Sequence, residues 1–367
     1  MNEPLFVLLY EFSPPFQRTL RGYKIVIDRI LCKLSKYFKV IIITGDYFRW
    51  TKPLRLSYWI NTILAAIKIL TIVKKYSKNN PKIILCHGTY GDLVSGIVKI
   101  FNPTVIVLGI YFHYEPRTVG RKKLLKVLAK LITNIEEKIK ITFYKYFYDQ
   151  IVTLSLSGKI MAYKAHRVPL NKVAVIGCTI DKFSIKKLKP EYEYIFIGHI
   201  AKAKDLVKIW PIILNKKPSA KLLLVGPSKG AERILEELTK LPNISYLGAI
   251  SPEERGRVFP KAKVMLFPSR REGWCMAIGE ALWAGLPVVA WNIPTLVEIY
   301  GSCKAVYLAK LNDYKEFSRY ALEAIEKYSE LSFYATQWAS SLPSWSAISL
   351  SLVKTLSKVI KHKYSVL

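Results

Sequence analysis

Glu272 and Glu280 are the residues whose types and spacing most suggest chemistry, in the stretch "PSRREGWCMAIGEALWAGLPVVA". The run "VMLFPS" before them is typical of a strand, "RREGW" of the loop at its carboxyl end, and "CMAIGEALWAG" of a helix. The unpaired N–H groups of a helix that begins at Cys275 and Met276 favour a phosphate or a sugar hydroxyl. The two carboxylates would then bracket one ligand. An isolated pair at this spacing is also a common accident among solvated glutamates, so the interpretation depends on the rest of the chain.

The elements that must position this pair are strands and helices in alternation along most of the 367 residues. The first half contains the apolar runs "LFVLLY", "KVIIITG", "KIILCHG", "TVIVLGI" and "QIVTLS", and the second half contains "YIFIGHI", "KLLLVGP", "ISYLGAI", "VMLFPS" and "PVVAWN". Strands that alternate with amphipathic helices are typical of βαβ units and parallel sheets. We therefore predict an α/β fold of two doubly wound, Rossmann-like domains with a cleft between them, faced by the carboxyl ends of the strands.

The charged, proline-containing stretch "DKFSIKKLKPEYE" interrupts the alternation and marks a domain boundary. We predict an N-terminal, acceptor-binding domain over residues 1–185 and a C-terminal, donor-binding domain over residues 186–340. After "PVVAWN" we expect helices and no further strand. The last helix, within residues 341–367, has no sheet of its own, and we expect it to return to the N-terminal domain.

The charge of the chain indicates an anionic partner, because 57 Lys and Arg against 26 Asp and Glu give a formal net charge of +31. The longest uncharged runs are too short, or too rich in Ser, Asn and Pro, to predict a transmembrane helix. The start "MNEPLFVLLYEFSPP" lacks a basic n-region and a cleavage site, so it predicts a first strand and not a signal peptide. The five cysteines are scattered without a C-x-x-C pair, which favours a reduced, cytoplasmic compartment and no metal site.

Five motifs of the chain follow the order and spacing of a known family. They are "VAVIGCTIDKF", "IFIGHIAKAKDL", "KLLLVGPSKGAERILEEL", the stretch from "ISYLGAI" to "GLPVVA", and the late "PSWSAISLSLVKTLSKVI". On these motifs the chain resembles the family 4 retaining glycosyltransferases (glycosyl transferases group 1), which have the GT-B fold and take sugars from nucleotide donors. The N-terminal half matches in layout only, as is normal for the domain that binds the variable acceptor.

The resemblance implies a donor site around the two glutamates. Glu272 would approach the hydroxyls of the donor sugar, and Glu280 would hold the ribose. Lys204, six residues after the donor-site Gly198, would neutralise the diphosphate, because fixed cations stabilise the charge that a leaving group gains. The residues at the loop and helix start that would contact the sugar and the diphosphate are Gly273, Trp274, Cys275 and Met276.

The sequence departs from the family pattern beside this lysine. His199 stands where the family has an arginine, and Asp205 stands where it has a glycine. A neutral His199 in the donor site can donate one hydrogen bond but cannot form the bidentate clamp of an arginine. Lys202 and Arg270 are the candidates to replace that arginine.

Two residues of the N-terminal half match the family pattern less closely. Gly22, in "EFSPPFQRTLRGYK", is the one surviving glycine of the family's phosphate-facing first loop. His113 lies just past a predicted strand, where many family members carry a histidine that faces the donor sugar. Glu115 and His87 are alternatives to His113, and a core or surface role for His113 stays open.

The resemblance implies a metal-independent transfer of a sugar, with retention of configuration, from a UDP- or GDP-sugar to a lipid or lipid-linked glycan. The expected place is the cytoplasmic face of a membrane, and the catalytic residues implied are Glu272, His113 and Lys204. The absence of an Asp-x-Asp triplet speaks against the metal-dependent GT-A class, and we expect a front-face displacement. Two alternatives remain open. One is a protein that binds or glycosylates nucleic acid, and the other is a GT-B relative without transferase activity, such as an epimerase or a donor-binding subunit.

The stretch at residues 117–145 predicts a contact with an anionic membrane, because it carries nine basic and two acidic residues. Its leucines recur at helical spacing with lysines off that face. We expect the part after Asn134 to belong to the core and the part from Arg117 to Lys130 to dock on the membrane. Lysines that are simply solvated are the alternative.

Overall fold

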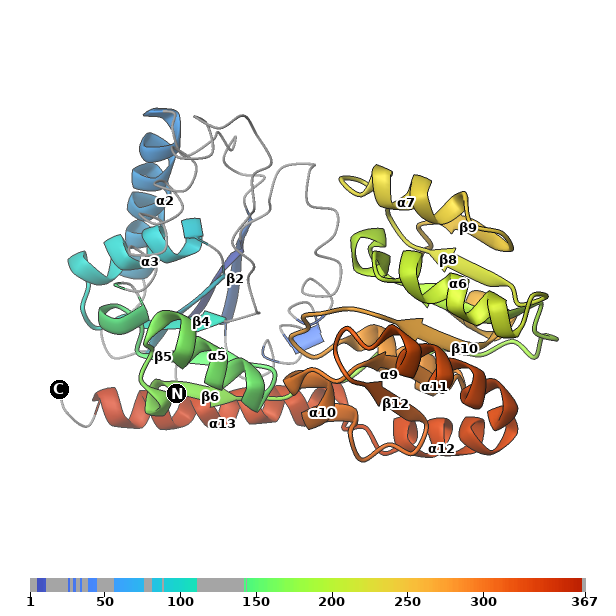
Figure 1. The fold of residues 1–367 in the computed structure, drawn as a ribbon. Helices are drawn as coiled ribbons and strands as arrows, with labels where there is room; N and C mark the ends of the chain where they lie inside the picture. The colour runs from blue at the N-terminus through green and yellow to red at the C-terminus, as the bar shows by residue number, and fades with distance from the viewer. Residues whose placement is uncertain are drawn as a thin grey trace. The chain divides into compact units, whose positions relative to one another are not determined.

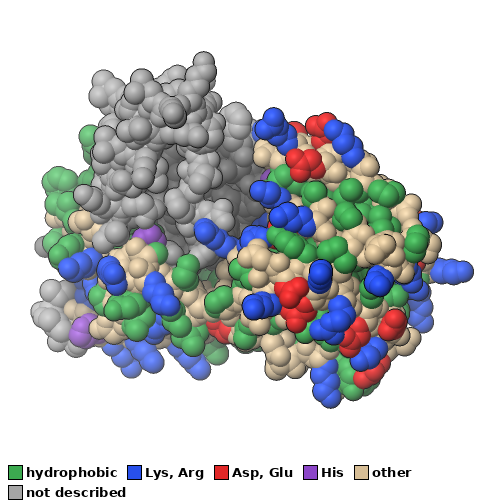
Figure 2. Space-filling view, in the orientation of Figure 1, with side chains coloured by type: hydrophobic (Ala, Val, Ile, Leu, Met, Phe, Trp, Pro, Cys, Tyr) green, Lys and Arg blue, Asp and Glu red, His purple; other side chains and the backbone are tan. Residues whose placement is uncertain are grey.

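The computed structural model in Figure 1 describes residues 5–10, 26, 29, 30, 34, 39–44, 56–75, 81–87, 89–110, 142 and 144–364. The chain divides into two compact units. Unit 1 comprises Met1–Cys178 and Trp345–Leu367, and unit 2 comprises Thr179–Ser344. In Figure 2, basic side chains occur over both units, and most of the acidic side chains in view lie over unit 2.

Unit 1 contains a six-stranded parallel sheet with the order β2-β1-β3-β4-β5-β6. Its strands are β1 (Leu5–Tyr10), β2 (Lys39–Thr44), β3 (Lys82–His87), β4 (Ile106–Ile110), β5 (Gln150–Thr153) and β6 (Val173–Val175). In the described part of unit 1, the helices with both ends described are α2 (Leu56–Lys75), α3 (Thr89–Phe101), α5 (Leu156–His166), the 3₁₀ helix η3 (Leu170–Lys172) and α13 (Trp345–Tyr364). Ile83, Ile84 and Leu85 of β3 are all buried, as expected of a parallel strand covered on both faces.

Helices α2 and α3 supply much of the core of unit 1. Ala65, Ile69 and Val73 recur every fourth residue along α2, and they are buried in one cluster with Val94 and Val98 of α3. Burying side chains of this kind stabilises the fold by roughly 1.5–3 kcal/mol for each large apolar residue. This spacing marks the inward faces of the two helices, although Ile63, Leu64 and Ile67 of α2 are exposed.

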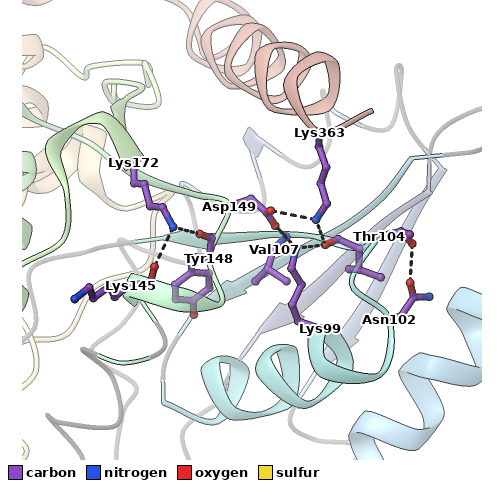
Figure 3. Close-up of polar contacts among 10 residues, drawn as sticks. Lys99, Asn102, Thr104, Val107, Lys145, Tyr148, Asp149, Lys172 and Lys363 are labelled. Carbon is purple, nitrogen blue, oxygen red and sulfur yellow. Dashed lines mark hydrogen bonds and ion pairs between the residues drawn. The ribbon is translucent and has the colours of Figure 1, made fainter. Parts of the chain in front are cut away.

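Helix α13 contacts the rest of unit 1 through a shared carboxylate. Lys363 Nζ, near the end of α13, lies 3.1 Å from Asp149 and donates to the carbonyl of Val105 at 2.8 Å. Lys99 of α3 donates to the same carboxylate at 2.7 Å and to the same carbonyl at 2.6 Å. These groups converge in Figure 3, where the amide of Val107 also donates to Asp149, at 2.7 Å. Burial lowers the pKa of Lys99 to about 8, although Asp149 acts in the opposite direction.

Unit 2 contains a second six-stranded parallel sheet, with the order β12-β11-β10-β7-β8-β9. Its strands are β7 (Tyr192–Ile197), β8 (Leu222–Val225), β9 (Ile244–Gly248), β10 (Ala262–Phe267), β11 (Val288–Trp291) and β12 (Val306–Ala309). Its helices are η4 (Ile200–Ala203), α6 (Leu206–Lys216), α7 (Glu232–Thr239), α8 (Arg255–Val258), η5 (Phe259–Lys261), α9 (Met276–Trp283), α10 (Pro294–Tyr300), α11 (Tyr314–Glu326) and α12 (Tyr328–Ser340).

The order of the second sheet reverses at β7. The chain runs outward from β7 through β8 to β9, and then returns to place β10 on the other side of β7. In an open parallel sheet, the loops after two such strands diverge and leave room for a ligand at their carboxyl ends. The two loops at this switch point are the segment after β7, which includes η4, and residues 268–275 after β10.

The two parallel α/β sheets confirm the predicted fold class, and each apolar run named above forms a strand. The expectation of no strand after "PVVAWN" is wrong, because β12 (Val306–Ala309) pairs in parallel with β11. Strand β12 has four residues, lies at the edge of its sheet and buries only two of them, so its sequence carries little pattern. Strand β6, which has three residues and lies at the edge of the first sheet, was also too short to be predicted from the sequence.

Among the helices that the structure describes, none combines the length and the apolar character needed to cross a lipid bilayer.

Candidate functional site

The candidate site lies in unit 2, at the switch point between β7 and β10. Gly198 directly follows β7 and Gly226 directly follows β8, and their backbones lie in close contact. A Cβ atom at Gly226 would come 1.8 Å from the carbonyl oxygen of Gly198, and the φ of Gly226 is +134°. Only glycine fits there, because it has no Cβ and adopts positive φ without strain. This pair of glycines brings the loops after β7 and β8 together.

Glu272 follows β10 and is held by two donors. Lys202 Nζ, from η4, lies 2.6 Å from Glu272 Oε1, and Ser269 Oγ donates to the same oxygen at 2.6 Å. The Glu272 side chain is mostly buried, whereas Lys202 is exposed. An ion pair therefore joins the two loops of the switch point, with its carboxylate inside and its ammonium group toward solvent.

Residues 273–275 turn the chain from this carboxylate into α9. The position of a Cβ at Gly273 is open, with no atom within 4 Å. Trp274 is buried with its ring edge-on to Tyr300, and the Tyr300 hydroxyl donates to the carbonyl of Cys275 at 2.7 Å. Cys275 has a left-handed φ of 67°, which a non-glycine residue adopts only when its surroundings impose it. The buried Tyr300 hydrogen bond and Trp274 contact supply that constraint.

Helix α9 begins with unpaired amides. Cys275 is its N-cap residue, but the Cys275 side chain caps no amide, and burial raises the pKa of its thiol. The amide of Ile278 donates to the carbonyl of Cys275 at 3.2 Å. Within the part of the chain that the structure describes, the amides of Met276 and Ala277 have no hydrogen-bond acceptor. Such a helix start can bind a phosphate or a hydroxyl.

Glu280 lies one turn into α9 and forms a buried ion pair with Arg255 of α8. The Arg255 Nη1 donates to Glu280 Oε1, and its Nε donates to the carbonyl of Pro252 at 3.0 Å. Burial raises the pKa of Glu280 to about 7, because Arg255 opposes the effect only in part and Asp181 adds to it. Arg255 was not predictable from the sequence, since nothing in "SPEERGRVF" distinguishes it from a solvated arginine.

His199 uses both ring nitrogens within the protein. Its Nδ1 accepts a hydrogen bond from the amide of Ala201 at 3.2 Å, and its Nε2 lies 3.1 Å from the carbonyl of Lys229. This pattern fits a neutral ring with the proton on Nε2. Burial lowers the pKa of His199, and the nearby Lys202 lowers it further. The single N–H donor of a neutral His199 is therefore used by the carbonyl of Lys229, in the loop after β8.

Asp205, which stands at the family's glycine position, binds Arg270. Arg270 Nε and Nη2 donate to the two oxygens of Asp205 at 2.7 and 3.1 Å. Trp291 Nε1 of β11 also donates to Asp205, at 3.0 Å. The φ of Asp205 is −71°, so this position does not require glycine. Lys204 precedes it at the end of η4 and is exposed.

The structure brings most of the predicted donor-site residues to one edge of the second sheet. Those on the β7 side are Gly198, His199 and Lys204, and those on the β10 side are Glu272, Gly273, Trp274, Cys275, Met276 and Glu280. Gly22, His113, Glu115 and most of the stretch at residues 117–145 lie outside the described residues. Lys202 and Arg255 are the additional charged groups that the geometry places against the two glutamates.

Sequence comparisons support a relationship to known sugar-transferring enzymes. A family model for glycosyl transferases group 1 matches residues 191–327. The O-antigen chain mannosyltransferase B of Escherichia coli is 31% identical over 267 residues, which cover 69% of this chain and 66% of that protein. The capsular polysaccharide biosynthesis glycosyltransferase CapM of Staphylococcus aureus is 24% identical over 282 residues, which cover 71% of this chain and 70% of that protein.

Solved structures share the whole fold at low sequence identity. A glycosyltransferase from Rickettsia africae superposes with a TM-score of 0.71 at 15% identity, over 98% of this chain and 100% of the other. HepE of Anabaena, in complex with UDP and glucose, superposes with a TM-score of 0.70 at 13% identity, over 97% and 100%. These likenesses establish the GT-B fold for this chain.

Proposed function

Because this chain belongs to the group 1 glycosyltransferases, we propose that it moves a sugar from a nucleoside diphosphate sugar to a lipid or lipid-linked glycan at the cytoplasmic face of a membrane. The transfer proceeds with retention of configuration. The observation that carries the donor assignment is the arrangement at the switch point of the second sheet. There, Glu272, the unpaired amides of Met276 and Ala277, and Glu280 follow one another from the loop into α9.

Each group in this series has a distinct role in binding the donor. Glu272 accepts hydrogen bonds from the hydroxyls of the sugar, and the start of α9 binds the diphosphate through its amides. Glu280 accepts hydrogen bonds from the ribose, with Arg255 holding its carboxylate in place. The donor is a UDP- or GDP-sugar, a choice supported by the UDP and UDP-glucose complexes of HepE, which shares the fold.

Cations without a metal ion stabilise the leaving group in this proposal. The leaving nucleoside diphosphate gains negative charge as the glycosidic bond breaks, and preorganised cations at that position lower the barrier. Lys204 supplies one cation. Lys202 supplies a second, in place of the family's arginine, once the sugar hydroxyls replace it on Glu272. Arg270 is a weaker candidate for that role, because both oxygens of Asp205 already bind it.

The lipid or lipid-linked acceptor is supported by the curated relatives. The matched proteins include an O-antigen chain mannosyltransferase of E. coli and a poly(glycerol-phosphate) α-glucosyltransferase of Bacillus subtilis. The first name refers to an O-antigen chain and the second to poly(glycerol-phosphate), so both names describe enzymes that add a sugar to a polymer. The high positive charge of this chain is compatible with an acceptor that carries phosphate groups.

The experiment that tests the proposal uses a panel of UDP- and GDP-sugars with the purified protein. Slow hydrolysis of one donor in the absence of acceptor would identify the sugar and the base. In that assay Glu280→Ala is expected mainly to weaken nucleotide binding, since a hydrogen bond to a charged group contributes about 1.5–3 kcal/mol. Glu272→Ala is expected to lower turnover more than affinity.

Variants of glutamates away from the switch point serve as controls. Glu236→Ala and Glu330→Ala remove acidic side chains from exposed parts of α7 and α12 and are expected to leave the kinetics unchanged. Unchanged donor kinetics in both Glu272→Ala and Glu280→Ala would remove the donor-site assignment.

A further inference from the structure

Helix α5 (Leu156–His166) of unit 1 reverses the usual amphipathic arrangement. Its buried residues are small or polar, namely Ser157, Gly158, Ala162 and His166. Its exposed residues include four large apolar ones, namely Leu156, Ile160, Met161 and Tyr163. The reason for the small inner face is the closeness of β5, because a Cβ atom at Gly158 would lie 2.2 Å from Thr153 Oγ1. The core therefore leaves the large apolar side chains of this helix on the outside.

The exposed apolar residues form a stripe with basic residues on both sides. Leu156, Ile160 and Tyr163 are spaced by four and three residues, so they lie above one another on one face and are 52%, 41% and 43% exposed. At 3.6 residues per turn, Lys159 falls on one side of this stripe and Lys164 on the other. We call these five residues the α5 face.

The surroundings of the α5 face extend both its apolar and its basic character. Leu170 of η3 and Val175 of β6 are exposed apolar residues on two elements that contact α5. Residues 150–180 contain no Asp or Glu, whereas they include the basic residues Lys159, Lys164, Arg167 and Lys172. Figure 2 shows hydrophobic and basic side chains intermingled over this part of unit 1.

We propose that the α5 face docks on an anionic lipid bilayer. The apolar stripe enters the boundary between headgroups and acyl chains, and the lysines on its flanks bind lipid phosphates while their aliphatic stems stay in the apolar layer. A membrane fits better than an acidic protein surface, because the apolar residues lie at the centre of the face and the charges at its rim. The inference rests on the proposed function only in that a lipid-linked acceptor is found at such a surface.

Co-sedimentation with vesicles tests this surface. The full-length protein is mixed with vesicles of phosphatidylglycerol and phosphatidylcholine, or of phosphatidylcholine alone, across a series of salt concentrations. Lys159→Gln/Lys164→Gln is expected to weaken binding to the anionic vesicles roughly 30-fold, the equivalent of about 1 kcal/mol per basic side chain for two side chains. Ile160→Ser/Tyr163→Ser is expected to remove the part of the binding that high salt does not screen.

Matched variants in unit 2 separate this surface from general effects of charge and hydrophobicity. Lys216→Gln/Lys221→Gln removes the same charge from exposed positions, and Val297→Ser/Phe333→Ser removes two exposed apolar side chains. Both are expected to bind vesicles like the wild type. Binding of a nucleoside diphosphate, measured for every variant, reports whether each one is folded.

Three outcomes would overturn the proposal. The first is equal vesicle binding by the wild type and both α5 variants. The second is binding of duplex DNA that is tighter than vesicle binding and depends on the α5 face. The third is a dimer in sedimentation velocity that Ile160→Ser/Tyr163→Ser dissociates, without any vesicle binding. Vesicle binding that depends on the α5 face, in a protein that hydrolyses or transfers no donor sugar, would support the docking surface and contradict only the proposed function.

Discussion

Lys202 Nζ lies 2.6 Å from Glu272 Oε1, and this ion pair connects the loops after β7 and β10. The hydroxyl of Ser269 donates to the same oxygen, so this carboxylate oxygen accepts hydrogen bonds from both an ammonium group and a hydroxyl. In the proposed reaction the hydroxyls of the donor sugar replace Lys202 on Glu272. Donor binding then frees a cation close to the start of α9, where the diphosphate is expected.

Lys202→Met is therefore expected to weaken binding of the UDP- or GDP-sugar donor by roughly tenfold to a hundredfold, because a charge-assisted hydrogen bond contributes about 1.5–3 kcal/mol. Arg270→Met is the matched comparison. It removes the same charge from the neighbouring loop, but Arg270 is already bound by Asp205, so its loss should leave donor affinity nearly unchanged. Isothermal titration calorimetry measures both. A larger loss of affinity in Arg270→Met than in Lys202→Met would indicate that Arg270 takes the role of the family's arginine.

Lys204→Met is expected to lower turnover at least about tenfold, which corresponds to about 1.4 kcal/mol of transition-state stabilisation. The exposed Lys204 side chain lies at the end of η4, and in the described part of the chain it has no hydrogen bond or ion pair. It is therefore available to a diphosphate. Initial rates with and without EDTA complete the measurement, and EDTA should leave the wild-type rate unchanged. Complete loss of activity in EDTA would refute the metal-free scheme.

The affinity for a nucleoside diphosphate is expected to rise between about pH 6 and about pH 8. Because burial raises the pKa of Glu280 to about 7, its carboxyl is largely protonated at the lower pH and ionised at the higher. An ionised carboxylate accepts hydrogen bonds from both ribose hydroxyls, whereas a protonated one has lost part of that capacity. Glu280→Gln should remove this component of the pH dependence, while the ionisation of the diphosphate affects both proteins equally. Parallel pH profiles for the two proteins would contradict the ribose contact.

Arg255→Met is expected to destabilise the protein more at about pH 8 than at about pH 5. The raised pKa of Glu280 means that the folded protein keeps this proton up to about pH 7, whereas the unfolded chain releases it near pH 4.5. Glu280 thus favours folding below about pH 4.5, and its contribution falls as the pH rises to about 7. Without Arg255, the ionised carboxylate is buried and unpaired, which costs on the order of 3–5 kcal/mol.

Urea-induced unfolding at the two pH values measures this effect. The double variant Arg255→Met/Glu280→Gln is the control, because it contains neither charge, and its loss of stability should differ little between the two pH values. Equal destabilisation of Arg255→Met at both pH values would show that Arg255 does not compensate the charge of Glu280.

The sequence was sufficient to predict the elements that carry the two glutamates. Alternating apolar runs and helices predicted both sheets, and the Glu272 loop and Glu280 helix lie where the pattern indicated. The partners of these residues were not predictable, because they come from distant parts of the chain. Arg255 lies 25 residues before Glu280, and Lys202 lies 70 residues before Glu272.

Departures from the family pattern were harder to interpret than matches to it. Asp205 stands where the family has a glycine, and it is buried and accepts hydrogen bonds from Arg270 and Trp291. His199 stands where the family has an arginine, and both of its ring nitrogens bind the backbone. In each case the new side chain has partners that only the folded chain brings together.

The single carboxylate of Asp149 in unit 1 pairs with two ammonium groups, those of Lys99 and Lys363. This unequal ratio restricts the order in which the three positions can change in evolution. Loss of either lysine leaves one cation with one anion, whereas loss of the aspartate first leaves two half-buried cations beside the carbonyl of Val105. Removal of Asp149 alone is therefore the least tolerable of the three changes, whereas the tail of α13 can lose Lys363 and leave the Lys99–Asp149 pair balanced.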